Sequence, residues 1–258
     1  MKDEFSPLHD PLAVYRTTLS GQLSLSMLAE QLVDNIDIQM IQINTDGLTF
    51  RIRKVDKDKM FKICKDWEKQ TNLILEYVKY KKMIVRDVNN YIAQDDKDYI
   101  KYKGCFEIDK KIGNEHAVHK NNSQRIVPIA LKNYFIDNIP LKETIINHKE
   151  IYDFCIGRKK GKNQQYVLVK KDENIELNDK IIRYFISNTN NKLYKIYKDK
   201  EDSKPEKINK GFNVSLFMNH YNSNDYNIDY NFYINECNKI INSVNEKKDD
   251  SNQLKLWQ

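Results

Sequence analysis

Residues 36–53 constrain the fold most, because they carry the pattern of a β-hairpin. The runs 36–44 and 48–53 are mainly apolar or alternate between apolar and polar residues, and Thr45-Asp46-Gly47 separates them. An Asp-Gly pair between two such runs is a strong local signal for antiparallel strands joined by a tight turn. The sequence therefore predicts a hairpin with one acidic residue, Asp46, at its tip.

Helical periodicity is found on both sides of this hairpin. Apolar residues recur at helical spacing over residues 12–33, which predicts a long, largely buried helix in which Gly21 marks close packing. Residues 56–72 carry apolar side chains at i, i+3, i+4 and i+7 with charges between them. This second pattern predicts an amphipathic helix that packs on a sheet.

Shorter alternating runs complete the first half of the chain. They predict strands over residues 75–88, 89–93 and 99–107, with a turn at residues 95–98. Helices and strands of this kind in separate stretches indicate the α+β class. Four dispersed cysteines without a C-x-x-C pair argue against a disulfide framework or a zinc ribbon.

A change in composition at residues 113–124 predicts a domain boundary, because Asn, His, Lys and Ser replace the periodic pattern there. The second module is predicted to be mixed and largely helical, and its elements can be listed by range. Helices are expected at 126–138, 141–155 and 230–244, and strands at 165–170, 181–188 and 193–198.

The net charge of +6 is modest for 258 residues, so it permits a nucleic-acid partner without requiring one. No apolar run approaches the roughly 20 residues that span a bilayer, which predicts no membrane association and a cytoplasmic location. Residue chemistry alone gives Asp46 an ordinary structural role, because Asp is favoured in turns for local reasons.

The order of several motifs nevertheless resembles the family B DNA polymerases of bacteriophages. Gly21-Gln22-Leu23 and Leu28-Ala29-Glu30-Gln31-Leu32 are similar to the helix before the third palm motif, and the hairpin is similar to that motif itself. The run from Arg86 to Ile92 with Lys103-Gly104 resembles the strand and turn that contact the primer end. The run from Ile181 to Ser187 resembles a thumb segment.

This resemblance implies that residues 1–120 are the C-terminal part of a palm, a β-hairpin and antiparallel sheet packed on helices. Residues 121–245 would be the thumb, and residues 246–258 a flexible tail. The resemblance also implies that Asp46 is a catalytic ligand of Mg²⁺ in a two-metal site. Asn44 stands where the family has another acid, and Gly47 replaces a Ser, as in the shortened form of phage relatives.

The remaining parts of such a site are expected outside this chain. No segment before Asp46 resembles the first palm motif or the Lys-rich helix that binds the incoming dNTP. The resemblance therefore implies an N-terminal polymerase chain as a partner, with little activity from this chain alone. A split gene and a truncated product are both compatible with this expectation.

Basic and polar residues near these motifs are the candidates for contacting primer-template DNA, although solvated surface charge is the competing interpretation. The candidates in the palm are Lys79, Lys81, Lys82, Arg86, Asn90, Tyr91, Lys103 and Gly104. Those in the thumb are Arg158, Lys159 and Lys160, which are expected in a basic turn between a helix and a strand.

The C-terminal residues Gln253, Leu254, Leu256 and Trp257 resemble a short peptide that docks replication proteins to a sliding clamp. A terminal strand or a disordered end is the alternative for this segment. The leading hypothesis is thus a part of a DNA-directed DNA polymerase. A non-catalytic DNA-binding or clamp-binding protein derived from a polymerase is the second, and an unrelated α+β protein the third.

Overall fold

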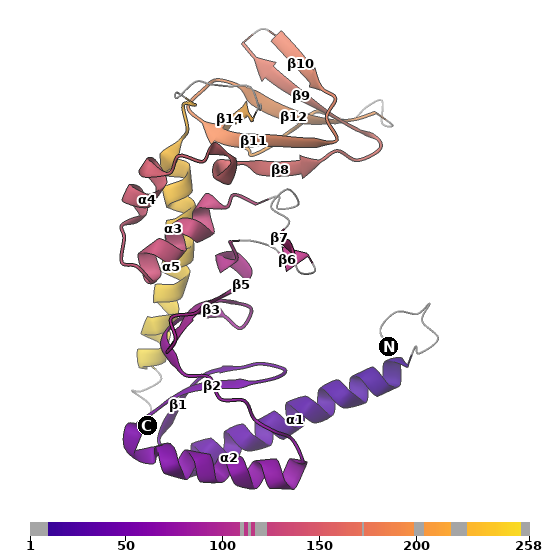
Figure 1. Ribbon diagram of the computed structural model, residues 1–258. Coiled ribbons are helices and arrows are strands. Elements are labelled where there is room, and N and C mark those ends of the chain that lie inside the picture. The colour runs from indigo at the N-terminus through magenta and orange to yellow at the C-terminus, as the bar shows by residue number, and fades with distance from the viewer. Residues whose placement is uncertain are drawn as a thin grey trace. The chain divides into compact units, whose positions relative to one another are not determined.

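The computed structural model describes residues 10–108, 111–112, 115–116, 123–171, 173–198, 204–217 and 226–253 (Figure 1). The fold is α+β, as predicted, with helices and antiparallel sheets. The chain divides into two compact units, Met1–Lys79 and Tyr80–Gln258. In the described part of the chain, no helix is both long and apolar enough to cross a membrane.

The first unit combines the predicted hairpin with two helices. Its elements in chain order are α1 (Pro11–Asn35), β1 (Ile38–Ile43), β2 (Leu48–Ile52), the 3-10 turn η1 (Lys54–Asp56) and α2 (Lys57–Thr71). Strands β1 and β2 pair antiparallel, with Ile43 opposite Leu48 beside the turn. Leu32 and Trp67 are almost fully buried between the helices, and Leu48 and Phe50 pack against the same cluster.

Helix α1 forms over the predicted range, but the prediction that it is largely buried was wrong. Its buried residues, Leu25, Leu28, Ala29 and Leu32, all lie in the C-terminal half. Helix α1 has 25 residues and α2 only 15. At 1.5 Å per residue, α2 therefore spans about 22 Å against about 37 Å for α1. Gly21 lies in the uncovered half, and no atom lies within 4 Å of a Cβ added there.

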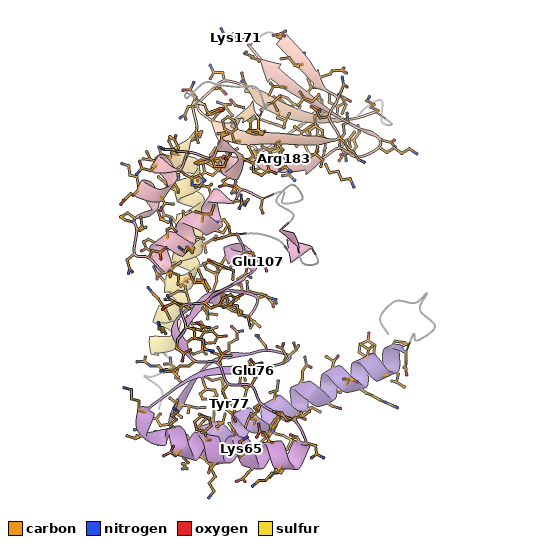
Figure 2. All side chains as sticks on the ribbon, viewed as in Figure 1. Lys65, Glu76, Tyr77, Glu107, Lys171 and Arg183 are labelled. Carbon is orange, nitrogen blue, oxygen red and sulfur yellow. The ribbon has the colours of Figure 1, made fainter. Side chains whose placement is uncertain are left out.

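The segment after α2 folds back onto that helix without forming a strand. Tyr77, which is labelled in Figure 2, packs edge-on against Phe61 of α2, with 5.1 Å between the ring centroids. Glu68 accepts a hydrogen bond of 2.8 Å from the Leu75 amide. The predicted strand at residues 75–88 therefore begins only at Tyr80, because the chain before it contacts α2 and not a neighbouring strand.

The second unit begins with a three-stranded antiparallel sheet in the order β3-β4-β5. Its strands are β3 (Tyr80–Asp87), β4 (Asn90–Asp95) and β5 (Ile100–Lys103), followed by the 3-10 turn η2 (Gly104–Phe106). The predicted strand at residues 99–107 ends at Lys103, because Gly104 takes the left-handed φ of +61° that starts the turn. A two-stranded sheet, β6 (Lys111–Ile112) with β7 (Glu115–His116), follows.

Helices and two further sheets complete the second unit (Figure 1). The helices are α3 (Ile126–Phe135), α4 (Leu141–Asn147), the 3-10 turn η4 (Ile151–Phe154) and α5 (Tyr230–Gln253). One sheet has the order β10-β9-β12-β13 and the other β14-β11-β8. These strands are β8 (Ile156–Lys159), β9 (Gln164–Lys170), β10 (Glu173–Leu177), β11 (Ile181–Ser187), β12 (Lys192–Tyr197), β13 (Glu206–Lys207) and β14 (Asn213–Leu216).

The boundary between the compact units differs from the one expected at residues 113–124. Ile92 of β4 and Phe106 of η2 are fully buried in the same cluster as Ile126 and Leu131 of α3. The sheet β3-β4-β5 therefore shares its core with the helices that follow it. A polar stretch of sequence marks a surface connection, whereas the buried side chains decide which elements fold together.

Candidate functional site

The tip of the β1–β2 hairpin presents Asp46 to solvent. The Asn44 amide donates a hydrogen bond of 2.8 Å to the Gly47 carbonyl, which closes the turn. Below the turn, a register shift between Met40 and Gln42 interrupts the ladder. A closed turn on strands that pack against two helices holds a side chain in one place, as a metal ligand requires.

Two side-chain oxygens beneath this tip have no hydrogen-bond partner among the described residues. These atoms are Oε1 of Gln42, a residue only 5% exposed, and Oδ1 of Asn44. A buried acceptor without a donor costs about 1–3 kcal/mol, so such atoms mark places where another group is expected. The amide oxygen of Asn44 and the carboxylate of Asp46 lie in the same four-residue turn.

This donor set fits Mg²⁺ in kind but not in number. Mg²⁺ prefers hard oxygen ligands and keeps near-octahedral coordination, usually with one or two carboxylates. Asp46 offers one carboxylate, and Asn44 offers one neutral oxygen. Among the residues that the structure describes, no group of three or more His, Cys, Asp or Glu side chains could hold a metal. A second carboxylate would have to come from elsewhere.

A second candidate surface lies at the end of the β3-β4-β5 sheet, where residues predicted from separate motifs meet. Asn90 Oδ1 accepts a hydrogen bond of 2.7 Å from the Cys105 amide, and Asn90 Nδ2 donates one of 2.7 Å to Asp87 Oδ1. Tyr91 and Lys103 are direct partners in the β4–β5 ladder. The turn after β3 and the turn after β5 are thereby joined.

Gly104 is required at this junction. A Cβ added to it would lie 2.3 Å from Asn90 Oδ1 and 2.4 Å from the Asn89 carbonyl.

The hydrogen bond from Asn90 holds the pKa of Asp87 below its ordinary value, and the Asn89 amide acts in the same direction. Asp87 therefore remains an anion that keeps the β3–β4 turn closed, with Arg86 beside it at 3.2 Å.

Other predicted palm residues lie apart from this junction. Lys81 forms an ion pair of 2.8 Å with Asp98 at the opposite end of the sheet, and Lys82 pairs with Gln94 at that same end. Lys79 precedes β3 and belongs to the first compact unit. Tyr91 is only 6% exposed, so little of its ring is available to a ligand. Arg86, Asn90, Lys103 and Gly104 are the residues that the sheet brings together.

The residues Arg158, Lys159 and Lys160 do not form the basic turn that was predicted. Arg158 and Lys159 lie on strand β8, which pairs with β11, and so they are held in a sheet. Lys160 Nζ donates to the carbonyls of Leu177 at 3.2 Å and Asn178 at 3.0 Å. Lys160 thus tethers the segment after β10, whereas Arg158 lines a pocket.

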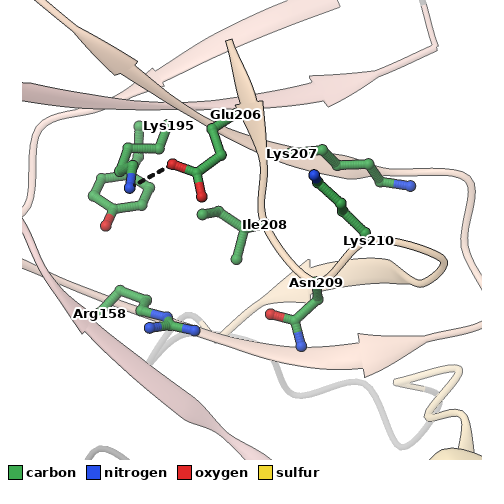
Figure 3. Close-up of a pocket in the computed structure, with 8 residues that line it drawn as sticks. Arg158, Lys195, Glu206, Lys207, Ile208, Asn209 and Lys210 are labelled. Carbon is green, nitrogen blue, oxygen red and sulfur yellow. Dashed lines mark ion pairs between the residues drawn. The ribbon is translucent and has the colours of Figure 1, made fainter.

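That pocket contains basic residues that sequence analysis missed. Lys195, Lys207 and Lys210 line it together with Arg158 (Figure 3). Arg158 lies on β8, Lys195 on β12, and Lys207 and Lys210 lie on β13 and in the segment after it. Because these residues are far apart in the sequence, no local run of basic residues predicted the pocket. In a Lys-rich sequence, only the pairing of strands distinguishes these positions from solvated surface charge.

Of the predicted clamp-binding residues, Gln253 is the last residue of α5. Leu254, Leu256 and Trp257 lie outside the described residues.

No family model, curated protein or solved structure matches this chain.

Proposed function

We propose that this chain is part of a DNA-directed DNA polymerase, which binds primer-template DNA and supplies Asp46 as a ligand of catalytic Mg²⁺. The observation that carries the proposal is the hairpin tip, where an exposed carboxylate stands beside the buried, unpartnered Oδ1 of Asn44. A buried amide oxygen without a donor marks a place where another group is expected to bind.

We assign the hairpin one chemical role, which is to hold catalytic Mg²⁺ ions in a fixed position. Two Mg²⁺ ions about 3.5–4 Å apart would activate the primer 3′-hydroxyl and neutralise charge on the departing pyrophosphate of the dNTP. Asp46 would bind them through its carboxylate, and Asn44 would add a neutral oxygen. The closed turn between Asn44 and Gly47 keeps both groups oriented.

The junction at Gly104 supports the DNA-binding half of the proposal. Arg86 and Lys103 place two cations near the two coupled turns, and Arg86 is also paired with Asp87 at 3.2 Å. Cations on a rigid sheet edge suit contacts with phosphates, which position a nucleic acid without reading its sequence. The primer strand is the ligand that we assign to this edge.

A partner must complete the site, because one aspartate cannot bind two metal ions and a triphosphate. Helix α1 offers a surface for such a chain. Its exposed face carries Leu12, Tyr15, Leu19, Leu23 and Met27, each at least 47% exposed. The run from Leu12 to Met27 contains a single charged residue, Arg16. We assign this face to the polymerase chain that supplies the second carboxylate, with both acting in the cytoplasm of the cell or of a phage host.

A second function, a DNA-binding protein without catalysis, is favoured by one observation. The cations Arg86, Lys103 and Arg158 lie in the second compact unit, whereas Asp46 lies in the first. Such a protein would keep the cations of the second unit and would use its C-terminal tail to reach a sliding clamp. It would not need Asp46.

Primer extension and DNA binding separate these functions. The polymerase proposal predicts Mg²⁺-dependent incorporation of dNTPs when the chain is combined with the chain that completes its site, and none from either alone. Duplex binding that weakens steeply with salt, without incorporation by any combination, would favour the binding protein. A chain that binds no DNA at low salt would contradict both.

A further inference from the structure

A pocket of about 260 Å³ opens beside β13 in the second unit (Figure 3). Its charged lining consists of four cations, Arg158, Lys195, Lys207 and Lys210, and one carboxylate, Glu206. Four positive charges and one negative charge leave a net charge of +3. A concave surface with this excess concentrates anions, because the walls of low dielectric constant focus the field into the opening.

The carboxylate in the pocket is already engaged. Glu206 forms an ion pair of 2.6 Å with Lys195, which Figure 3 shows as a dashed line. The hydrogen bond from Lys195 holds the pKa of Glu206 below its ordinary value, and Lys210 and Arg158 act in the same direction from farther away. Neither Lys207 nor Lys210 forms an ion pair with a residue that the structure describes. The ammonium groups of Lys207 and Lys210 can therefore pair with an anionic ligand.

The frame of the pocket is fixed before any ligand arrives. Arg158 is hydrogen-bonded to the buried hydroxyl of Tyr184, and that hydroxyl donates a bond of 2.7 Å to Asn209 Oδ1. The turn that carries Lys210 is closed by a bond of 3.0 Å from the Phe212 amide to the Asn209 carbonyl. Asn209 and Gly211 both have left-handed φ values in this turn. These bonds thus fix strand β8, which carries Arg158, and the turn that carries Lys210.

The lining also indicates which part of a nucleic acid would enter. Tyr166 is the aromatic residue of the lining, and it is only 3% exposed, so it offers no ring face on which a base could stack. Arg and Lys side chains with few apolar neighbours suit the phosphodiester backbone, which is recognised by charge and hydrogen bonding. Arg158 supplies directional donors, and Lys210 supplies a point charge.

We propose that this pocket is a preformed site for a backbone phosphate of the bound DNA, with Arg158 and Lys210 as the residues that contact it. The assignment rests on the proposed function, because that function supplies the DNA. It adds an anchor far along the chain from both Asp46 and the Gly104 junction, built by residues from three separate segments.

The test measures binding of a fluorescent primer-template duplex across a series of salt concentrations. The variants are Lys210→Gln and Arg158→Gln, and the charge-matched control is Lys142→Gln, an exposed residue of α4 outside the pocket. Each pocket variant is expected to reduce the slope of log affinity against log salt by about 0.9, the contribution of one phosphate contact. Lys210→Gln leaves every described hydrogen bond of the frame intact, so its result does not depend on folding.

A second arm titrates inorganic phosphate into the wild-type protein while the backbone amides of Asn209 and Lys210 are followed by NMR. Phosphate-dependent shifts together with the reduced slopes support the proposal. Phosphate-dependent shifts with unchanged slopes would overturn it in favour of a site for free phosphate. Unchanged slopes without shifts would overturn it completely. A wild-type protein that binds no DNA contradicts the proposed function, and the phosphate titration then reports separately on the pocket.

Discussion

The side chain of Asn90 bridges two turns of the second unit, because its Oδ1 accepts a hydrogen bond of 2.7 Å from the amide of Cys105. Its Nδ2 donates to Asp87 at 2.7 Å on the other side. This bridge fixes the edge at which Arg86 and Lys103 lie, and it leaves no space for a side chain at Gly104. The geometry of the proposed DNA-binding edge thus depends on one amide and one glycine.

Gly104→Ala is therefore expected to destabilise the second unit by about 2–4 kcal/mol. The new Cβ would meet Asn90 and Asn89 at under 2.5 Å, and alanine is strained at a φ of +61°. Urea unfolding followed by circular dichroism measures the change. Gly211→Ala is the matched control, since its φ is also positive but no atom lies within 4 Å. Equal losses from both variants would contradict the bridge.

Tyr184→Phe is expected to lower the free energy of unfolding by about 0.5–1.5 kcal/mol, the net contribution of one hydrogen bond. The change removes the buried hydroxyl that joins the exposed Arg158 to the partly buried Asn209. Thermal unfolding of the variant and of Tyr99→Phe, whose ring is 68% exposed, measures the difference. A variant as stable as the control would show that this hydrogen-bond chain does not hold the pocket frame.

Asp153 anchors a buried polar network at the start of the helical layer. It is only 4% exposed, and its carboxylate contacts Arg125 at 2.5 Å and His148 at 2.7 Å. Asp153→Asn is expected to cost about 3–5 kcal/mol, because Arg125, whose side chain is only 16% exposed, then loses its counter-charge. Asp66→Asn, which weakens an exposed pair with Lys69 at 3.4 Å, is expected to cost less than about 0.5 kcal/mol. Urea unfolding of both variants checks the contrast.

Alkaline pH is expected to destabilise the second unit through two buried thiols. Burial raises the pKa of Cys155 and of Cys237 from 9.0 to about 12. Between pH 9 and pH 12, the thiols of the unfolded chain lose their protons while those of the folded chain keep them. The free energy of unfolding therefore falls as pH rises, by about 1.4 kcal/mol for each thiol and each pH unit. Urea unfolding at pH 8 and pH 10 should show a smaller loss for the Cys155→Ala/Cys237→Ala variant than for the wild type. Equal losses would contradict the raised pKa values.

Local patterns predicted the parts of the fold that local chemistry decides. The Asp-Gly turn fixes the β1–β2 hairpin, and the spacing of Met60, Cys64 and Trp67 fixes the buried face of α2. The short strands β8, β10 and β14 were not predicted, because four or five residues carry little periodicity. The burial of α1 was overestimated, since an apolar stripe does not specify how much of it a neighbour covers.

The candidate site divides in the same way. The sequence predicted Asp46 at a hairpin tip and the adjacent strands that carry Tyr91 and Lys103, whereas the pairing of these two residues comes from the structure. The pocket joins Arg158, Lys195 and Lys210 through the pairing of strands distant in the chain, and no sequence window contains all three. The ion pair between Lys81 and Asp98 likewise depends on tertiary structure.

Whether Asp46 is a ligand of catalytic Mg²⁺ can be measured by the rate of Mg²⁺-dependent dNTP incorporation by the completed polymerase. The Asp46→Asn variant is compared with Asp34→Asn. Asp34 is an exposed carboxylate of α1 in the same compact unit. We expect Asp46→Asn to lower the rate at least about 100-fold without weakening duplex binding, since even groups outside the metal's ligand shell contribute 10–100-fold. We expect no change for Asp34→Asn. An Asp46→Asn protein that incorporates dNTPs at the wild-type rate would contradict the assignment of Asp46 as a metal ligand.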